Sequence, residues 1–294
     1  MPADAPTLDQ KPNADGGMTP ASEGSGHGAR EHRVPRWLRP WIPMGVLVVV
    51  WWVVTDLVLQ KPRIYPTPQL VAGELGRILS GESPLGSTYA HAGATLARLL
   101  VAFLAAFVIG TVLGIVAGRV KSLFDFSNSL VWIGLAVPSV VWVFVFLVVF
   151  GIGDVVPVVA LVVMLTTPVF LGSAEGAKAI DRELLEMAAS YRADWRSRLR
   201  DLYLPAILPF MLANGRVAFA LGIKVVIIAE VVGLPNGIGL LVKYWKDQLY
   251  MAPVVAWGVL LIVMGFVVDR WLFGYFEKRS LRRTGARVSV VSAE

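Results

Sequence analysis

Six apolar stretches, each about long enough to cross a lipid bilayer, constrain this sequence more than any other feature. A spanning helix needs about 20 mostly apolar residues, because it must cross roughly 30 Å of hydrocarbon. We therefore predict an all-α membrane protein with six transmembrane helices, contained within residues 35–278. The stretches run from Trp41 to Leu59, Ala92 to Gly118, Leu130 to Phe150, Val155 to Ala174, Ile207 to Val232 and Pro253 to Tyr275.

The composition supports a lipid-facing exterior. Hydrophobic residues make up 56% of the chain and charged residues 16%, whereas an ordinary soluble domain has about 25% charged residues. The chain has no cysteine, which excludes disulfides, cysteine metal sites and thiol nucleophiles. The only histidines are His27, His32 and His91, and the first two lie in a polar tail. We therefore expect neither a metal site nor a catalytic centre in this chain.

The basic residues predict the orientation. Most of the 27 Lys and Arg residues lie in four places: the N-terminal tail, the connection after the second stretch, the segment between the fourth and fifth, and the C-terminus. The positive-inside rule then places both termini in the cytoplasm. Residues 1–34 are rich in Pro, Gly, Ala, Ser and Asp and predict a disordered cytoplasmic tail, and residues 279–294 a basic one. On the outer side we expect two short helices, Gln69 to Leu79 and about Leu240 to Gln248, the second after the turn-rich segment Gly233–Gly239.

A charged segment of about 30 residues, approximately 175–205, separates the fourth and fifth stretches. Asp181 can cap a helix through Ala189, and Asp194 can cap a second helix that Pro205 and Pro209 limit. Two short amphipathic helices at a membrane face suit docking onto a soluble partner. The alternative is a solvated loop whose charges only fix the topology.

This segment contains the triplet Glu186-Met187-Ala188 and, further along, the pair Leu204-Pro205. In the triplet and in its distance from the Leu-Pro pair, the segment resembles the EAA motif of the membrane subunits of bacterial binding-protein-dependent ABC importers. The wider pattern is similar to the branch that transports nitrate, taurine and aliphatic sulfonates. It includes Tyr65-Pro66-Thr67-Pro68, Thr95-Leu96-Ala97-Arg98, Val137-Pro138, Phe150-Gly151-Ile152-Gly153-Asp154 and Ala229-Glu230.

The resemblance implies a type I importer permease in a bacterial inner membrane. In that family two permease copies, identical or closely related, face each other around a central path. A dimer of ABC ATPase subunits binds beneath them and takes each EAA loop into a cleft, and an extracytoplasmic binding protein delivers the solute. This chain has no G-x-x-x-x-G-K-[ST] sequence to hold ATP phosphates. ATP and Mg would therefore be bound by the partner ATPase, and we expect no cofactor, no enzymatic activity and no nucleic-acid partner for this chain.

Two residues depart from the family motif. Met187 replaces the first Ala, and Arg192 stands where the family has Gly between the two helices. A glycine there supplies a left-handed turn without strain, and Arg in that geometry costs about 1 kcal/mol. Either the first helix continues further, or Arg192 makes a compensating contact with the partner.

Ionisable residues inside a span are candidates for a transport path, because they are costly in lipid. Arg216, Lys224 and Glu230 all lie on the fifth stretch. Lys224 and Glu230 are about 240° apart on a helix, so they do not share a face. Snorkelling or pairing between helices is the alternative explanation. Our hypothesis is that Lys224, nearest the middle of the membrane, faces the path and favours an anionic solute.

Glycines and prolines in the spans carry further expectations. Gly110, Gly114 and Gly118 form two successive G-x-x-x-G steps, which predict close helix packing within one chain or between two. Pro138 and Pro168 should kink the third and fourth spans.

Two other classes of protein remain alternatives. A secondary transporter or channel would show inverted repeats or buried carboxylates in paired broken helices, and only Glu230 fits that description. A membrane enzyme would need a cluster of His, Asp or Glu at the bilayer face, which the sequence does not display.

Overall fold

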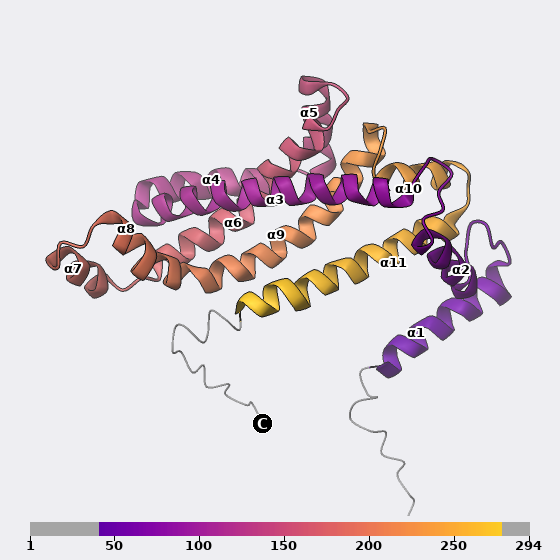
Figure 1. Ribbon diagram of the computed structural model, residues 1–294, viewed down its shortest axis with the longest axis horizontal. Helices are drawn as coiled ribbons and strands as arrows, with labels where there is room; N and C mark the ends of the chain where they lie inside the picture. Colours follow the sequence, from indigo (N-terminus) through magenta and orange to yellow (C-terminus); the bar gives the residue numbers. More distant parts are fainter. Residues whose placement is uncertain (1–40, 278–294) are drawn as a thin grey trace, which may run out of the picture. The chain divides into compact units, whose positions relative to one another are not determined.

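The computed structural model describes residues 41–277, and within this range every regular element is helical (Figure 1). The predicted all-α class is confirmed for this part of the chain. The two predicted tails, residues 1–34 and 279–294, lie outside the described residues. In chain order the α-helices are α1 (Trp41–Val53), α2 (Pro68–Leu79), α3 (Thr88–Arg119), α4 (Lys121–Ala136), α5 (Ser139–Phe150), α6 (Val155–Lys178), α7 (Arg182–Ser190), α8 (Trp195–Ser197), α9 (Leu204–Gly233), α10 (Ile238–Asp247) and α11 (Met251–Val267), and π-helical segments cover Val54–Leu59, Arg198–Tyr203 and Val268–Phe273.

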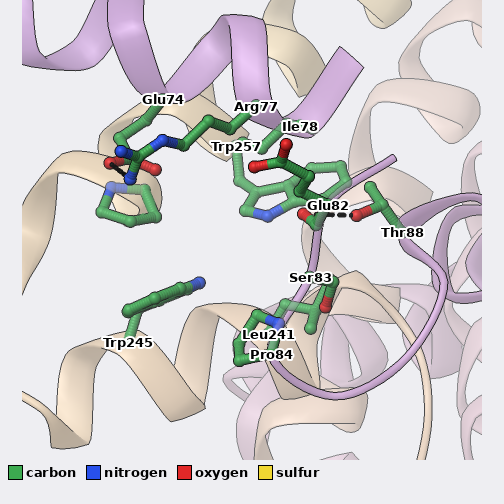
Figure 2. A pocket seen from close by; sticks show the side chains of 11 residues that line it. Glu74, Arg77, Ile78, Glu82, Ser83, Pro84, Thr88, Leu241, Trp245 and Trp257 are labelled. Atoms are coloured by element: carbon green, nitrogen blue, oxygen red, sulfur yellow. Dashed lines mark hydrogen bonds and ion pairs between the residues drawn. The ribbon is translucent and has the colours of Figure 1, made fainter. Parts of the chain in front are cut away.

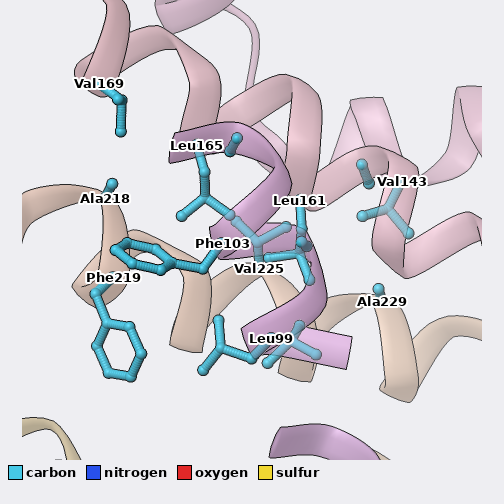
Figure 3. Packing of buried hydrophobic residues seen from close by; sticks show 14 of the residues in the cluster. Leu99, Phe103, Val143, Leu161, Leu165, Val169, Ala218, Phe219, Val225 and Ala229 are labelled. Atoms are coloured by element: carbon cyan, nitrogen blue, oxygen red, sulfur yellow. The ribbon is translucent and has the colours of Figure 1, made fainter. Parts of the chain in front are cut away.

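The centre of the fold is formed by α3, α6 and α9. The chain divides into two units, residues 1–46 and 47–294, and all contacts described below lie within the second. In it, α6 packs along both α3 and α9. Their facing side chains form one apolar cluster, in which Leu99, Leu165 and Val226 have no exposed surface (Figure 3). Because lipid is as apolar as leucine, helices in a membrane associate through such close contact.

The glycines of α3 allow α6 to approach closely. A Cβ added to Gly114 would lie 2.6 Å from the carbonyl oxygen of Phe170, and one added to Gly118 would lie 2.6 Å from that of Ala174. Real Cβ atoms do not come so near to a backbone oxygen, so only glycine permits this separation of the two helices. The predicted G-x-x-x-G packing is confirmed, and it joins two helices of the same chain.

The number of spans lies between four and six. Four helical segments are long and apolar enough to cross a membrane: Ile42–Leu59, Thr88–Arg119, Val155–Lys178 and Met251–Glu277. Two further candidates are pairs of helices that bend by more than 40° at a short break, Lys121–Gly134 with Ser139–Phe150 and Trp195–Gly233 with Ile238–Asp247. The predicted count of six is reached if each bent pair is one span, and it stays a prediction.

The third predicted stretch, Leu130–Phe150, is not one continuous helix. The chain leaves helical geometry at Val137–Pro138 and resumes it in α5, because proline disfavours helical backbone in the residue before it. The kink predicted at Pro138 is therefore a full break. At Pro168, by contrast, α6 continues through the proline.

The two short helices expected on the outer side, α2 and α10, are both present. They pack with α11, around buried Val71, Leu241 and Trp257. The α7–α8 segment comes directly before α9 in the chain, and α10 comes directly after it. The two regions therefore lie at opposite ends of α9. Because α9 has 30 residues, it separates these two regions by about 45 Å along its axis.

Candidate functional site

The predicted docking segment forms two short helices between α6 and α9. Asp181 occupies the N-cap position of α7, although its side chain makes no capping hydrogen bond. Asp194 does cap α8, and its Oδ1 accepts a hydrogen bond from the backbone N–H of Ser197 at 3.2 Å. Hydrogen bonds from Ser197, from its side chain first and then its backbone, lower the pKa of Asp194 below its usual value. The cap is therefore fully ionised at neutral pH.

One face of α7 is attached to the bundle and the other is open to solvent. Leu185 packs against the buried cluster that holds Tyr203 and Ile207. On the outer surface, Glu186 keeps 67% of its side chain exposed and pairs with Arg182 at 3.0 Å. Met187 is also exposed, and Ala188 is half-buried. The triplet Glu186–Ala188 thus presents one carboxylate and one flexible apolar side chain to solvent.

Arg192 adopts the left-handed backbone that the motif's glycine would supply. Its φ is +51°, in the turn between α7 and α8, and its side chain is exposed. Among the described residues Arg192 has no ion pair. The first of the two alternatives, a longer first helix, is wrong, because α7 ends at Ser190, and the contact with a partner stays a prediction.

The sequence predicted that Pro205 and Pro209 would limit the second helix. In the structure these prolines do not end it. Helical structure continues from α8 through the π-helical segment Arg198–Tyr203 into α9, with Pro205 in its first turn and Pro209 inside it. Proline is tolerated in a first turn, since the missing N–H has no partner there. Leu204 and Pro205 therefore begin the long helix itself and connect the docking segment directly to it. Arg119, at the end of α3, lies over the ring of Tyr203 at 5.0 Å.

A second cluster of polar residues lies at the other end of α9. Arg98 of α3 has 6% of its surface exposed, and its Nη1 donates to Oε1 of Glu230 at 2.6 Å. Its Nε and Nη2 donate to Oδ1 of Asp154 at 2.9 Å and 2.5 Å, and Asn236 accepts from it through both backbone and side-chain oxygens. One guanidinium group therefore joins α3, the start of α6 and the α9–α10 turn.

Glu230 is fully buried, and its carboxylate accepts several hydrogen bonds. Thr95 donates its hydroxyl to both carboxylate oxygens at 2.9 Å, and the backbone N–H of Gly239 donates to Oε2 at 2.8 Å. Gly237 has a φ of +116°, and an added Cβ there would overlap the Glu230 carboxylate. The α9–α10 turn is thus folded around this side chain, and His91 accepts from the N–H of Gly237 at 3.0 Å.

The other two path candidates of α9 lie in different surroundings. Arg216 pairs with Asp269 at 3.0 Å and with Glu277 at 2.8 Å, both at the end of the last helix. Glu230 and Arg216 therefore make the ion pairs between helices that the alternative reading expected. Lys224 is exposed and has no ion pair among the described residues, and it shares a strip of α9 with exposed Val217 and Ala220.

Arg98, Asp154 and Asn236 were not among the residues predicted for the site. The sequence contained a signal for Arg98 and Glu230, because each is a charge inside an apolar stretch and the two charges are opposite. Asp154 and Asn236 lie in turns rich in glycine, where polar residues are common and do not indicate a functional site. The three regions that meet here had been noted only as separate segments of a resemblance.

The arrangement suits a mechanical rather than a chemical role. An exposed charged segment lies before α9, and helical structure runs from α8 through Arg198–Tyr203 into α9. α9 carries Lys224 on its exposed face and ends in a buried ion-pair cluster. Within residues 41–277 there is no group of three or more His, Cys, Asp and Glu side chains that could hold a metal ion.

Comparisons with known proteins are consistent with this geometry. Residues 110–282 match the family model described as binding-protein-dependent transport system inner membrane component. The chain is 25% identical to the taurine transport system permease protein TauC of Escherichia coli, over 77% of this chain and 82% of that protein. It is 28% identical to the putative aliphatic sulfonates transport permease protein SsuC of the same organism, over 80% and 89%. It is 30% identical to the riboflavin transport system permease protein RibX of Chloroflexus aurantiacus, over 73% and 78%.

Proposed function

Since the chain belongs to the family of binding-protein-dependent transport system inner membrane components, whose model matches more than half of it, we propose that it forms the path of an ATP-driven importer for a small anionic solute. The chain is the permease subunit of an ABC importer. What we propose is the class of solute and the way in which the permease is coupled to an ATPase. The observation that carries the coupling is the exposed α7–α8 segment, which is continuous with α9.

In the proposed mechanism a separate ATPase binds α7 and α8 on the cytoplasmic side. Glu186 and Met187 supply the exposed contact surface, and Arg192 reaches the ATPase from its left-handed turn. ATP and Mg are held by that partner. Closure of the ATPase dimer moves α7 and α8, and α9 carries the movement into the membrane as a rigid-body rotation.

The proposed assembly has two permease copies around a central path and a solute-binding protein on the outer side. All six apolar stretches span the inner membrane in this assembly, with both termini in the cytoplasm. The α2 and α10 helices, at the end opposite to α7 and α8, would then face the binding protein. The strip of α9 that carries Lys224 packs against neither α3 nor α6, which suits a surface that lines the path.

The proposed solute carries a negative charge, as a sulfonate or a related oxyanion does. The names of TauC and SsuC refer to taurine and aliphatic sulfonates, and an exposed lysine on an apolar strip attracts an anion. We expect Lys224→Met to reduce uptake of such a solute strongly while the complex still assembles. Undiminished anion uptake by this variant would contradict the role of Lys224 and leave the coupling proposal intact.

Charge reversal tests the docking segment. Glu186→Lys should lower both recovery of the ATPase subunit during co-purification and ATP-dependent uptake in proteoliposomes. Asp247→Lys is the matched control for recovery of the ATPase, because Asp247 is an exposed carboxylate at the end of α9 opposite to α7 and α8. If Glu186→Lys retains the ATPase and transports at the normal rate, the docking assignment is wrong. Uptake that does not require ATP would favour a secondary transporter.

The absence of cysteine makes the orientation directly measurable. Arg192→Cys and Lys246→Cys each introduce a single thiol, on the α7–α8 turn and on α10. A membrane-impermeant maleimide added to intact cells should label the second and not the first, and inverted vesicles should give the reverse pattern. Labelling of residue 192 from outside would end the proposal, since the ATPase works in the cytoplasm.

A further inference from the structure

A cavity of about 250 Å³ lies among α2, the α2–α3 connection, α10 and the beginning of α11 (Figure 2). It is at the end of the molecule opposite to α7 and α8, and it is separate from the Arg98 cluster. Its size is slightly below that of a pocket for a drug-sized ligand. It therefore suits a molecule or a chemical head group of a few heavy atoms. Its lining includes the side chains of Glu74, Arg77, Glu82, Trp245 and Trp257.

The walls of the cavity are held in place without a ligand. Trp257 is 4% exposed and belongs to a buried apolar cluster. Glu74, 7% exposed, accepts from Tyr250 Oη at 2.8 Å and from Arg77 Nη1 at 3.2 Å. Burial first, and then this bond to Glu74, raises the pKa of Tyr250, so its hydroxyl remains a donor. A preformed site loses little entropy when it binds.

The connection that closes the cavity is also fixed by hydrogen bonds. The carbonyl oxygen of Glu82 accepts from the Thr88 hydroxyl at 2.9 Å, and its backbone N–H donates to the carbonyl oxygen of Arg77 at 3.1 Å. Ser80 Oγ donates to the same Arg77 carbonyl at 2.8 Å. These bonds fix the backbone at Glu82, whose side chain lines the cavity together with Trp257 (Figure 2).

The cavity offers groups for a positive charge on one side. Within residues 41–277 the carboxylate of Glu82 has neither an ion pair nor a hydrogen bond. Glu82 and Trp257 line the same side of the cavity in the view of Figure 2. An ammonium group between a carboxylate and an indole ring gains both an ion pair and a cation–π contact. Glu82 and Trp257 therefore form a half-site for an ammonium group.

The cavity also offers donors for a negative charge. The ring nitrogens of Trp245 and Trp257 point into the open space in Figure 2, and an indole N–H can only donate. Arg77 uses one N–H for Glu74 and keeps 66% of its side chain exposed, so its remaining N–H groups are available. Trp245 is kept in position by the ring of Tyr250, with centroids 5.6 Å apart.

We propose that this cavity binds a small zwitterion, an ammonium group joined by a short linker to an acidic oxyanion group. Glu82 and the face of Trp257 take the ammonium, and Arg77 with the indole N–H of Trp245 takes the oxyanion. Two sources carry this chemistry: a free solute such as an amino sulfonate, and the head group of phosphatidylethanolamine. Leu70 and Leu79 on α2 are exposed apolar side chains, which would suit contact with the acyl chains of such a lipid.

The test uses the purified full-length chain without ATPase or binding protein, so it is independent of the transport proposal. In a detergent free of phosphatidylethanolamine, taurine and phosphoethanolamine are titrated while Tm is measured. Binding to the folded state raises Tm in a saturable way. Ethylammonium and methanesulfonate, which carry one end each, should bind at least about tenfold more weakly, since each loses a charge-assisted contact.

Variants locate the binding. Glu82→Gln and Trp245→Phe should each weaken the apparent Kd about tenfold, through loss of a hydrogen bond to a charged group. Asp247→Asn is the matched control on α10, because its carboxylate is exposed and does not line the cavity. Each variant is first shown to have the Tm and elution volume of the wild-type protein without ligand. If Glu82→Gln does not retain these, Trp245→Phe carries the test.

A second arm distinguishes the two sources. The protein is placed in nanodiscs that contain phosphatidylethanolamine or only phosphatidylglycerol, and retained lipid is counted by native mass spectrometry. Retention of phosphatidylethanolamine that Glu82→Gln abolishes identifies the head group as the ligand, and binding of the free solutes alone identifies a solute site. The proposal is overturned if neither source binds, if ethylammonium binds as tightly as taurine, or if the cavity variants bind as the wild-type protein does.

Discussion

Replacing Arg98 with Met would leave a carboxylate without a cation in the interior of the protein. Glu230 has no exposed surface, and Arg98 is the cation that contacts it. Removal of one partner from a buried pair costs about 3–5 kcal/mol, because the remaining charge stays out of water. Asp154, the other carboxylate on Arg98, keeps 70% of its side chain exposed. Asp154→Asn should therefore cost no more than about 1 kcal/mol.

The effect of Glu230→Gln on the free energy of unfolding should change sign when Arg98 has already been replaced by Met. In the wild-type protein Glu230→Gln should destabilise by about 1–3 kcal/mol, because Arg98 loses its buried partner. In Arg98→Met the same change should stabilise. It removes the unpaired charge, and the amide oxygen still accepts from Gly239 N–H and the Thr95 hydroxyl.

The measurement is a double-mutant cycle on the free energy of unfolding, from denaturant titrations of the four proteins in detergent micelles. We expect a coupling energy of at least about 2 kcal/mol between Arg98 and Glu230. Effects that add within about 0.5 kcal/mol would show that the two residues act independently and would refute the reasoning. A cost for Asp154→Asn equal to that of Arg98→Met would show instead that the exposed pair carries the stability.

Four further substitutions have outcomes set by the backbone. Gly114→Ala should cost more than about 2 kcal/mol by separating α3 from α6, whereas Gly93→Ala in the same helix, where the added Cβ meets open space, should stabilise slightly in the same unfolding assay. Arg192→Gly should relieve about 1 kcal/mol of strain at its φ of +51°, seen as a raised Tm; an unchanged Tm would contradict the strain. Gly237→Ala should lower folded yield severely, since its Cβ would overlap the Glu230 carboxylate, and normal yield with an unchanged Tm would show that the α9–α10 turn differs in solution.

The sequence was sufficient to place the long helices, because apolar length alone defines a span. The stretches Ala92–Gly118 and Val155–Ala174 lie inside α3 and α6, which extend beyond them by a turn or less at each end. It was not sufficient to fix the number of crossings. Hydropathy does not distinguish a continuous span from two helices that meet at an angle, and the break at Val137–Pro138 is of that kind.

The site was predictable where the relevant geometry is local. The cap at Asp194 and the left-handed turn at Arg192 depend on neighbouring residues. The cap was expected from the sequence, and the turn was one of the two alternatives left open there. The contact between Arg98 and Glu230 joins residues 132 positions apart. A helical wheel places Glu230 on a different face from Lys224, but it does not identify the residue that Glu230 meets.

The order in which the partners of Arg98 are synthesised has a consequence for how the protein enters the membrane. Translation proceeds at about 5–20 residues per second. Asp154, 56 residues downstream, therefore follows Arg98 by roughly 3–11 seconds, and Glu230, 132 residues downstream, by roughly 7–26 seconds. During this interval α3 carries an unneutralised guanidinium in its N-terminal half. Asp154 is the first carboxylate to reach it, so the solvent-facing ion pair neutralises the nascent helix until the permanent one has been made.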